Sequence, residues 1–283
     1  MLKTRIITAV VLLILLIAIL VYGGSVGWNA FIAVVLLTAL WEWGRLGQLP
    51  ANNAWVYSAV ATGLSVIAYQ ALNLAVQSFP IMALAGMFWV LVAPWCLRNV
   101  SLGPVSRQAV FLPLGVVLIG AACVALILAK AQGIVFLLSM IAICFAADIF
   151  AYFFGKAFGK RKLAPRVSPG KSWEGAIGGA LSVLALGWLV VALSPTWPWL
   201  NETWQVKALQ QWHPVLFSFW LLVLSAFSVV GDLFESMLKR AAGMKDSSQL
   251  LPGHGGVLDR IDAQLPVMPL ALLLVAQSLG QVA

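Results

Sequence analysis

The sequence predicts an all-α integral membrane protein with about nine transmembrane helices, and three observations support this fold class. The chain of 283 residues is 62% hydrophobic and only 9% charged, whereas about a quarter of the residues in a soluble domain are charged. Its mean hydropathy is +0.99. Long apolar runs recur along the chain, and a hydrocarbon core of about 30 Å requires roughly 20 such residues per helix. Lipid is therefore the expected solvent for most of the protein.

Nine apolar runs account for most of the length and leave little chain for a soluble domain. They cover residues 6–22, 28–41, 55–70, 81–97, 109–129, 134–154, 176–193, 215–230 and 265–279. The first run could be a signal peptide, but Gly23, Gly24 and Ser25 lead into the second run without a clear cleavage pattern, so we expect an uncleaved anchor. No internal repeat or linker interrupts the series. Residues 1–283 are therefore expected to form a single polytopic membrane domain.

Basic residues set the expected orientation, because Lys and Arg accumulate in cytosolic loops. If the N-terminus is cytosolic, nine spans place all but two of the 17 Lys and Arg residues on the cytosolic side. The exceptions are Lys130 and Lys207. A missed or additional span would invert every later loop and destroy this partition. The C-terminus is accordingly expected outside.

Three connecting segments are longer than the others. Two are cytosolic, at about residues 155–175 and 231–264, and these are the expected catalytic loops. The third, residues 194–213, lies outside and contains four tryptophans, Trp197, Trp199, Trp204 and Trp212. Tryptophan is enriched at the headgroup level of membranes. We therefore expect a helix or turn that anchors this outer segment at the interface.

Acidic residues concentrate around the two cytosolic loops. Seven of the nine in the chain lie in or beside them: Asp148, Glu174, Asp232, Glu235, Asp246, Asp259 and Asp262. Asp148 falls within the sixth apolar run, where a carboxylate costs about 2.5–3.5 kcal/mol at mid-membrane. A metal or substrate role would compensate for this cost. A structural ion pair, or a position near the inner end of the helix, would do so as well.

Spacing relates the other acids to one another. Asp232 closes the eighth apolar run, and Ser236 follows one helical turn later on the same face. A solvated helix end would accommodate such an acid equally well. Asp259 and Asp262 are three residues apart and would share a helical face, so the second could support the first.

The last cytosolic loop combines cations, acids and glycines in a short stretch: Lys239, Arg240, Lys245, Asp246, Gly253, His254, Gly255, Gly256, Asp259, Arg260 and Asp262. Glycines let backbone amides approach a phosphate, Lys and Arg neutralise it, and carboxylates hold Mg²⁺. Topology alone would also place cations here, and His254 fits a plain turn residue as well as a ligand. The combination favours a phosphate and metal site.

The other cytosolic loop contains a second candidate phosphate-binding segment. Residues 168–175 are Ser-Pro-Gly-Lys-Ser-Trp-Glu-Gly and precede an expected helix. Ser168 and Lys171 could bind phosphate at the start of this helix, although the glycine spacing is not that of a Walker A loop. The alternative is a polybasic loop that binds anionic headgroups.

The stretch from Ser236 to Asp262 resembles the signature of the phosphatidate cytidylyltransferase (CDP-diacylglycerol synthase) family. The matching positions are Ser236, Leu238, Lys239, Arg240, Lys245, Asp246, Ser248, Leu251, Pro252, His254, Gly255, Gly256, Asp259, Arg260 and Asp262. Residues 168–175, the helix of Asp148 and the nine-span plan are also similar to that family. Ala263 departs from the pattern, since many relatives carry Ser there.

The resemblance implies transfer of CMP from CTP to phosphatidate, which forms CDP-diacylglycerol and pyrophosphate. It also implies a homodimer in the lipid of the bacterial inner (cytoplasmic) membrane, an active site that faces the cytosol, and no nucleic-acid partner. Mg²⁺ is the implied cofactor, and a second cation such as K⁺ is left open. A related membrane transferase for another phosphorylated or polyprenyl lipid is one alternative. A transporter with Asp148 as its ion site is another, although the acids here collect at the inner ends of the spans.

We assign the following roles on this basis. The predicted metal ligands are Asp148, Asp232 and Asp259, and the predicted catalytic residues are Asp232, Asp259, Lys245 and Asp246. The predicted substrate-binding residues are Ser168, Lys171, Ser236, Lys239, Arg240, His254, Gly255, Gly256, Arg260 and Asp262. A phosphate monoester is already anionic at neutral pH, because its second pKa is about 6, so the nucleophile needs no general base.

Overall fold

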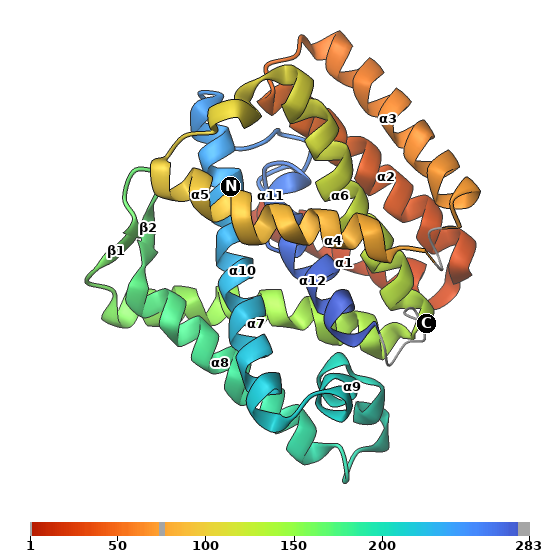
Figure 1. Cartoon of the computed structure of the whole chain (residues 1–283), viewed down its shortest axis with the longest axis vertical. Coiled ribbons are helices and arrows are strands. Elements are labelled where there is room, and N and C mark those ends of the chain that lie inside the picture. The colour runs from red at the N-terminus through yellow and green to blue at the C-terminus, as the bar shows by residue number, and fades with distance from the viewer. Residues whose placement is uncertain (1, 74–76, 277–283) are drawn as a thin grey trace.

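The protein is almost entirely helical in a computed structural model that describes residues 2–73 and 77–276 (Figure 1). The helices are α1 (Leu2–Tyr22), α2 (Gly24–Leu46), α3 (Ala51–Ala71), α4 (Phe79–Met87), α5 (Ala93–Asn99), α6 (Gln108–Ala131), α7 (Ile134–Phe158), α8 (Trp173–Leu193), α9 (Trp204–Gln211), α10 (Pro214–Ala241), α11 (Leu258–Ile261) and α12 (Gln264–Val275). A π-helical segment, Phe88–Val92, joins α4 to α5. Two short strands, β1 (Lys162–Ala164) and β2 (Ser168–Ser172), pair in antiparallel fashion.

Six helices of the described residues are long and apolar enough to cross a membrane. They are α2, the continuous α4–α5 segment over Phe79–Asn99, α6, α7, α8 and α10. Each contains 21 to 28 residues, which matches the thickness of a hydrocarbon core. The predicted all-α membrane class is confirmed at this level, and six of the nine predicted spans have a counterpart.

The other three predicted spans correspond to helices of a different character. The first run forms a shorter apolar helix over Ile6–Tyr22. The third forms α3, which is long enough but contains Asn52, Asn53 and Ser58. The ninth forms α12, with 12 residues in the described part of the chain, of which nine are buried. This helix packs inside the protein, against α4, α6 and α10.

Close packing of α7 against α8 positions one wall of the site. The two helices lie side by side at the lower edge of Figure 1. A Cβ atom at Gly179 would lie 2.6 Å from the carbonyl oxygen of Ala147, and one at Gly175 would lie 2.7 Å from that of Ala151. Only glycine allows this approach. This close packing places Asp148 of α7 beside the first turns of α8.

The β-hairpin projects beside α10 and ends directly at α8 (Figure 1). Ser172 closes β2 and caps the helix, because its Oγ accepts a hydrogen bond of 3.2 Å from the amide of Gly175. Residues 168–172 form the extended strand β2. The predicted helix begins directly after this strand, at Trp173. This strand carries Lys171 toward α10.

The tryptophan segment at residues 194–213 differs in part from the predicted interfacial anchor. Trp197 and Trp199 are exposed, as expected, whereas Trp204 is fully buried. Its Nε1 donates to the carbonyl of Ala271, and Nε1 of Trp212 donates to that of Leu274, at 2.8 and 2.7 Å. Trp204 and Trp212 therefore bind the backbone of α12. Buried indole N–H groups need such hydrogen-bond acceptors.

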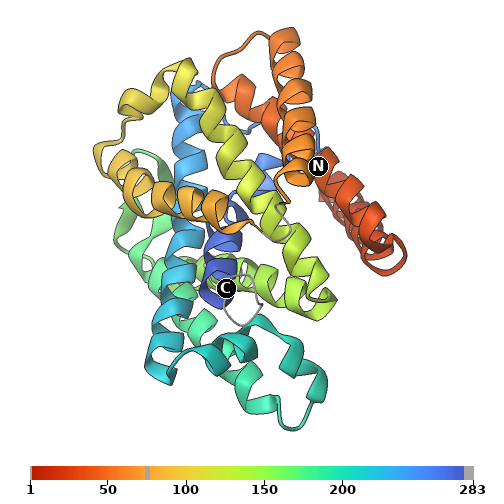
Figure 2. The ribbon, with the colours of Figure 1, turned by 45° about the vertical axis from the view of Figure 1, so that its right-hand side comes forward.

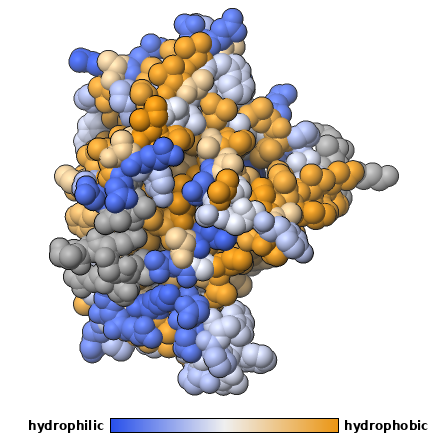
Figure 3. Space-filling view, turned by 90° about the vertical axis from the view of Figure 1, so that its right-hand side faces the viewer, coloured by the Kyte–Doolittle hydropathy of each residue, from blue (hydrophilic) through white to orange (hydrophobic). Residues whose placement is uncertain are grey.

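The surface of the protein is apolar over a large area, as expected for a protein surrounded by lipid. Figure 3 shows apolar side chains over the centre and right of one face, with hydrophilic residues in separate patches. Figure 2 shows α1, together with the start of α2, projecting away from the remaining helices. Exposed apolar residues are numerous on α1, among them Ile7, Leu13 and Ile14, each more than half exposed. Such an area would be an aggregation liability in water.

Candidate active site

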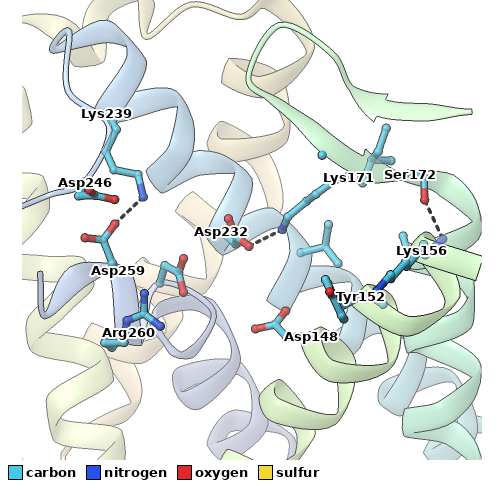
Figure 4. A pocket seen from close by; sticks show the side chains of 18 residues that line it. Asp148, Tyr152, Lys156, Lys171, Ser172, Asp232, Lys239, Asp246, Asp259 and Arg260 are labelled. Carbon is cyan, nitrogen blue, oxygen red and sulfur yellow. Dashed lines mark hydrogen bonds and ion pairs between the residues drawn. The ribbon is translucent and has the colours of Figure 1, made fainter. Parts of the chain in front are cut away.

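A polar cavity of about 680 Å³ lies between α7, β2, α10 and the segment that follows α10. Its charged lining residues are Asp148, Lys156, Lys171, Asp232, Lys239, Asp246, Asp259, Arg260 and Asp262. All of these residues except Lys156 were predicted as catalytic, substrate-binding or metal-binding. Asp148 lies on α7, and the other seven lie on β2, on α10 and in the last loop. Figure 4 labels all of these charged side chains except Asp262 and shows them around a common space. Both predicted catalytic loops therefore contribute to one site.

One group of carboxylates surrounds Lys171. Its Nζ lies 2.5 Å from Oδ2 of Asp232, and Figure 4 shows the side chain reaching from β2 to α10. Asp148 and Asp262 lie within electrostatic range of both residues. Ser236 Oγ donates to Oδ1 of Asp232 at 3.3 Å, so the two residues lie on one helical face, as predicted. Burial, followed by the charge of Asp232, raises the pKa of Asp262.

The donor chemistry of this group fits Mg²⁺. Asp148, Asp232 and Asp262 offer hard oxygen atoms, and one lysine ammonium is the cation among them. Within the described residues, no group of three or more His, Cys, Asp or Glu side chains is already arranged as a metal cage. Mg²⁺ typically takes one or two carboxylates together with substrate phosphates and waters. The carboxylates of this group are of the type that would hold Mg²⁺ in such a site.

A second group is centred on Asp259. Oδ1 lies 2.5 Å from Nζ of Lys239, which also lies 2.5 Å from Oε2 of the buried Glu235. Oδ2 accepts from the Ser247 amide at 2.9 Å, the Ser247 hydroxyl at 2.8 Å and the Gly256 amide at 2.7 Å. Burial raises the pKa of Asp259, but Lys239 and these hydrogen bonds outweigh burial and hold the pKa below its usual value.

The predicted metal ligands thus divide between the two groups. Asp148 and Asp232 lie together, with Asp262 as their neighbour, while Asp259 lies with Lys239. The role of Asp259 as a metal ligand stays a prediction. In the structure its carboxylate organises the loop and pairs with a lysine that faces the cavity.

The glycine turn supports this second group directly. Gly255 has φ +82°, and a Cβ atom there would lie 2.6 Å from Oδ2 of Asp259. A Cβ atom at Gly256 would overlap the Ser247 hydroxyl and the carboxylate of Glu42. The amide of Gly256, predicted to approach a phosphate, donates to Asp259 in the structure. These glycines therefore allow close packing around two carboxylates.

Seven predicted residues are not part of the wall of the main cavity. Ser236, Gly255 and Gly256 lie against its aspartates, as described above, and the other four lie elsewhere. His254 is in the turn, with its amide donating to the carbonyl of Leu251 at 2.8 Å, and Lys245 is exposed. Ser168 begins β2. Arg240 lines a separate cavity of about 430 Å³ together with Arg166. Because successive helical residues point about 100° apart, Lys239 and Arg240 face different spaces.

Comparison with known proteins identifies the family of the chain. The model of the cytidylyltransferase family matches residues 3–277. The chain belongs to the cytidylyltransferase family. It is 39% identical over 287 residues to a phosphatidate cytidylyltransferase of Pseudomonas aeruginosa, covering 99% of both chains. A protein of that name from Brucella abortus is 35% identical, with 96% of this chain and 92% of the relative covered. One from Staphylococcus aureus is 32% identical, with 98% and 100% covered.

Two residues of this cytidylyltransferase-family site were missed by the sequence reasoning. Lys156 on α7 lines the cavity, and Glu42 on α2 contacts the loop around Asp259. A signal for Glu42 exists, because it follows an apolar run directly and is one of only nine acidic residues. Its partners are more than 200 positions away in the sequence, so spacing could not connect them.

Proposed function

We propose that this chain transfers CMP from CTP to phosphatidate, forming CDP-diacylglycerol and pyrophosphate. The observation that carries the proposal is the cavity in which five aspartates and four cations meet at the ends of α7 and α10. Membership of the cytidylyltransferase family supports the nucleotide chemistry. The names of relatives that match nearly the whole chain support the lipid substrate.

The proposed reaction is an in-line displacement at the α-phosphorus of CTP. A phosphate oxygen of phosphatidate forms the new P–O bond, and the bond from the α-phosphorus to the bridging oxygen breaks, so that pyrophosphate leaves. The phosphate monoester is already ionised at neutral pH, and no side chain has to remove a proton. The main obstacle is repulsion between two polyanions, which cations in the site reduce.

The cations of the cavity have distinct positions for this task. Lys171 and Lys239 enter from opposite sides, and each is paired with an aspartate. Arg260 and Lys156 complete the positive lining. We assign these four side chains to the phosphates of the two substrates. Arg240, with Arg166, would contact an anionic group from the separate cavity, and Lys245 would act from the exposed part of the loop.

Mg²⁺ is the proposed cofactor, held by Asp148 and Asp232 with Asp262 or Asp259 as a further ligand. When bound, it would neutralise phosphate charge and align the displacement. The same carboxylates could accommodate a second cation such as K⁺.

The first prediction concerns substrate and metal requirements. Purified protein should release pyrophosphate from CTP only when phosphatidate and Mg²⁺ are both present. Phosphatidate supplies the attacking oxygen, and Mg²⁺ would reduce the repulsion between the two anionic substrates. Chelation by EDTA should abolish release, and added Mg²⁺ should restore it. Turnover without a lipid phosphate, equal use of ATP, or preference for a different lipid phosphate would contradict the proposal.

We also propose that the chain forms nine spans in a bacterial inner membrane, as a homodimer, with a cytosolic N-terminus, an outer C-terminus and a cytosolic active site. The partition of Lys and Arg supports this arrangement. In a single domain over residues 1–283, the loops at about 155–175 and 231–264 would then be the catalytic ones.

The second prediction tests this orientation. The cysteines of the native chain are buried, so a cysteine introduced at an exposed position should be the main target of an impermeant thiol reagent. Lys162→Cys should react from the cytosolic side only, and Gln210→Cys from outside only, since both positions are exposed. Labelling in inverted and right-side-out vesicles measures this. Reversed labelling would exclude the proposed orientation.

A further inference from the structure

Glu42 is a fully buried carboxylate that no substrate role explains. It lies near the end of α2, is 0% exposed, and is not part of the cavity lining. Oε1 accepts from the Ser248 hydroxyl at 2.5 Å and the Val257 amide at 2.9 Å. Oε2 accepts from the Leu258 amide at 2.7 Å and lies 3.2 Å from the Ser247 hydroxyl. Both oxygens are thus occupied by the last loop.

These donors flank two acids of the cavity. Ser247 and Ser248 follow Asp246 directly, whereas Val257 and Leu258 precede Asp259. A single carboxylate therefore holds two chain segments, ten residues apart, at the points where each delivers an aspartate to the cavity. The requirement for glycine at position 256 has the same origin, because a Cβ atom there would overlap the Glu42 side chain.

The Ser247 hydroxyl links Glu42 to the cavity. Its Oγ lies 2.8 Å from Oδ2 of Asp259 and 3.2 Å from Oε2 of Glu42. A hydroxyl has one proton to donate, so it serves one carboxylate at a time and keeps the two close together. Asp259 in turn holds Lys239. A path of contacts runs from α2 to a lysine that faces the substrate space.

The buried charge itself needs an explanation. A buried carboxylate without partners is strongly unfavourable, and even a well-paired one is often no better for stability than an apolar residue. What an apolar residue could not do is fix four donors of an irregular loop.

We propose that Glu42 is a positioning residue of the transferase site, which sets Asp246, Asp259 and Lys239 in the cavity without touching substrate. This inference rests on the proposed function for its kinetic consequences. Its structural part, that Glu42 holds residues 247–258, does not depend on that function.

Hydrogen exchange of Glu42→Gln tests the structural part. The amide of Gln keeps the shape but turns an NH₂ group toward donors that need an acceptor. Exchange at the Val257 and Leu258 amides should accelerate at least about tenfold, while peptides from α8 should not change. Glu202→Gln is the matched control, because Glu202 is exposed, pairs with Lys207 and does not line the cavity.

Kinetics of the same variants test the positioning role. Displacement of catalytic groups by about 1 Å can cost 10²-fold in rate, so kcat/KM for CTP should fall by about that factor in Glu42→Gln and stay unchanged in Glu202→Gln. If Glu42 acts through Ser247, adding Ser247→Ala should cost little more than the larger single effect. A purely structural role would give additive losses, a lower Tm and normal kinetics of the folded fraction.

The outcomes separate the possibilities. Unchanged exchange at Val257 and Leu258 would overturn the proposal, and so would accelerated exchange with normal kcat/KM. If Glu42→Gln does not fold, Ser248→Ala removes a single hydrogen bond and should shift both measurements in the same direction by a smaller factor. If wild-type protein shows no CTP-dependent transfer to phosphatidate, the proposed function fails, and the exchange experiment still decides whether Glu42 holds the loop.

Discussion

Asp232→Asn should lower kcat by at least about 10²-fold, even at saturating CTP and phosphatidate. The substitution keeps the shape of the side chain but removes the charge that pairs with Lys171 and that, in the proposed site, would hold Mg²⁺. A metal ion contributes several kcal/mol of charge stabilisation in the transition state, and 1.36 kcal/mol corresponds to a factor of ten in rate. Pyrophosphate release at several Mg²⁺ concentrations measures the loss.

Lys245→Ala provides the contrast for this experiment. Lys245 is exposed and lies outside the cavity wall, so its loss should raise the apparent KM for a substrate more than it lowers kcat. Both variants must first be shown to be folded and to have the oligomeric state of the wild type. A kcat of Asp232→Asn within threefold of wild type would remove Asp232 from the proposed metal site.

The sequence located the acids and cations of the site but not their partners. Helical spacing correctly paired Asp232 with Ser236, because that contact depends only on the geometry of one helix. The contact between Lys171 and Asp232 depends on how the β-hairpin packs beside α10. Spacing cannot supply such information when 60 residues of chain intervene. The predicted grouping of Asp148, Asp232 and Asp259 was subject to the same limit.

Hydropathy likewise predicted the fold class, but it did not show whether each helix faces lipid or packs inside the protein. An apolar run has the same composition whether it faces lipid or packs inside the protein. α12 is apolar because it is buried among other helices, and Trp204 contacts its backbone instead of the membrane interface. The close contact of α7 with α8 was encoded in Gly175 and Gly179, but only the partner helix shows why these positions must be small.

Gly256→Ala should impair both stability and activity, although it adds one methyl group. The new Cβ atom would overlap the Ser247 hydroxyl and the carboxylate of Glu42. Both groups are already hydrogen-bonded and buried, so they cannot move without losing partners. Overpacking of this kind costs about 1–3 kcal/mol. The resulting shift of the loop should displace Asp259 and lower kcat/KM for CTP by about 10²-fold.

Gly63→Ala is the matched control for this glycine substitution. A Cβ atom at Gly63, within α3, would meet no atom within 4 Å, and Ala is favoured over Gly in a helix by about 0.8–1 kcal/mol. The midpoint of thermal unfolding should therefore fall in Gly256→Ala and stay equal or rise in Gly63→Ala, with normal turnover in the latter. Wild-type stability and turnover in Gly256→Ala would show that the loop can accommodate a side chain at this position. The close packing of Glu42, Ser247 and Asp259 would then not be a requirement of the fold.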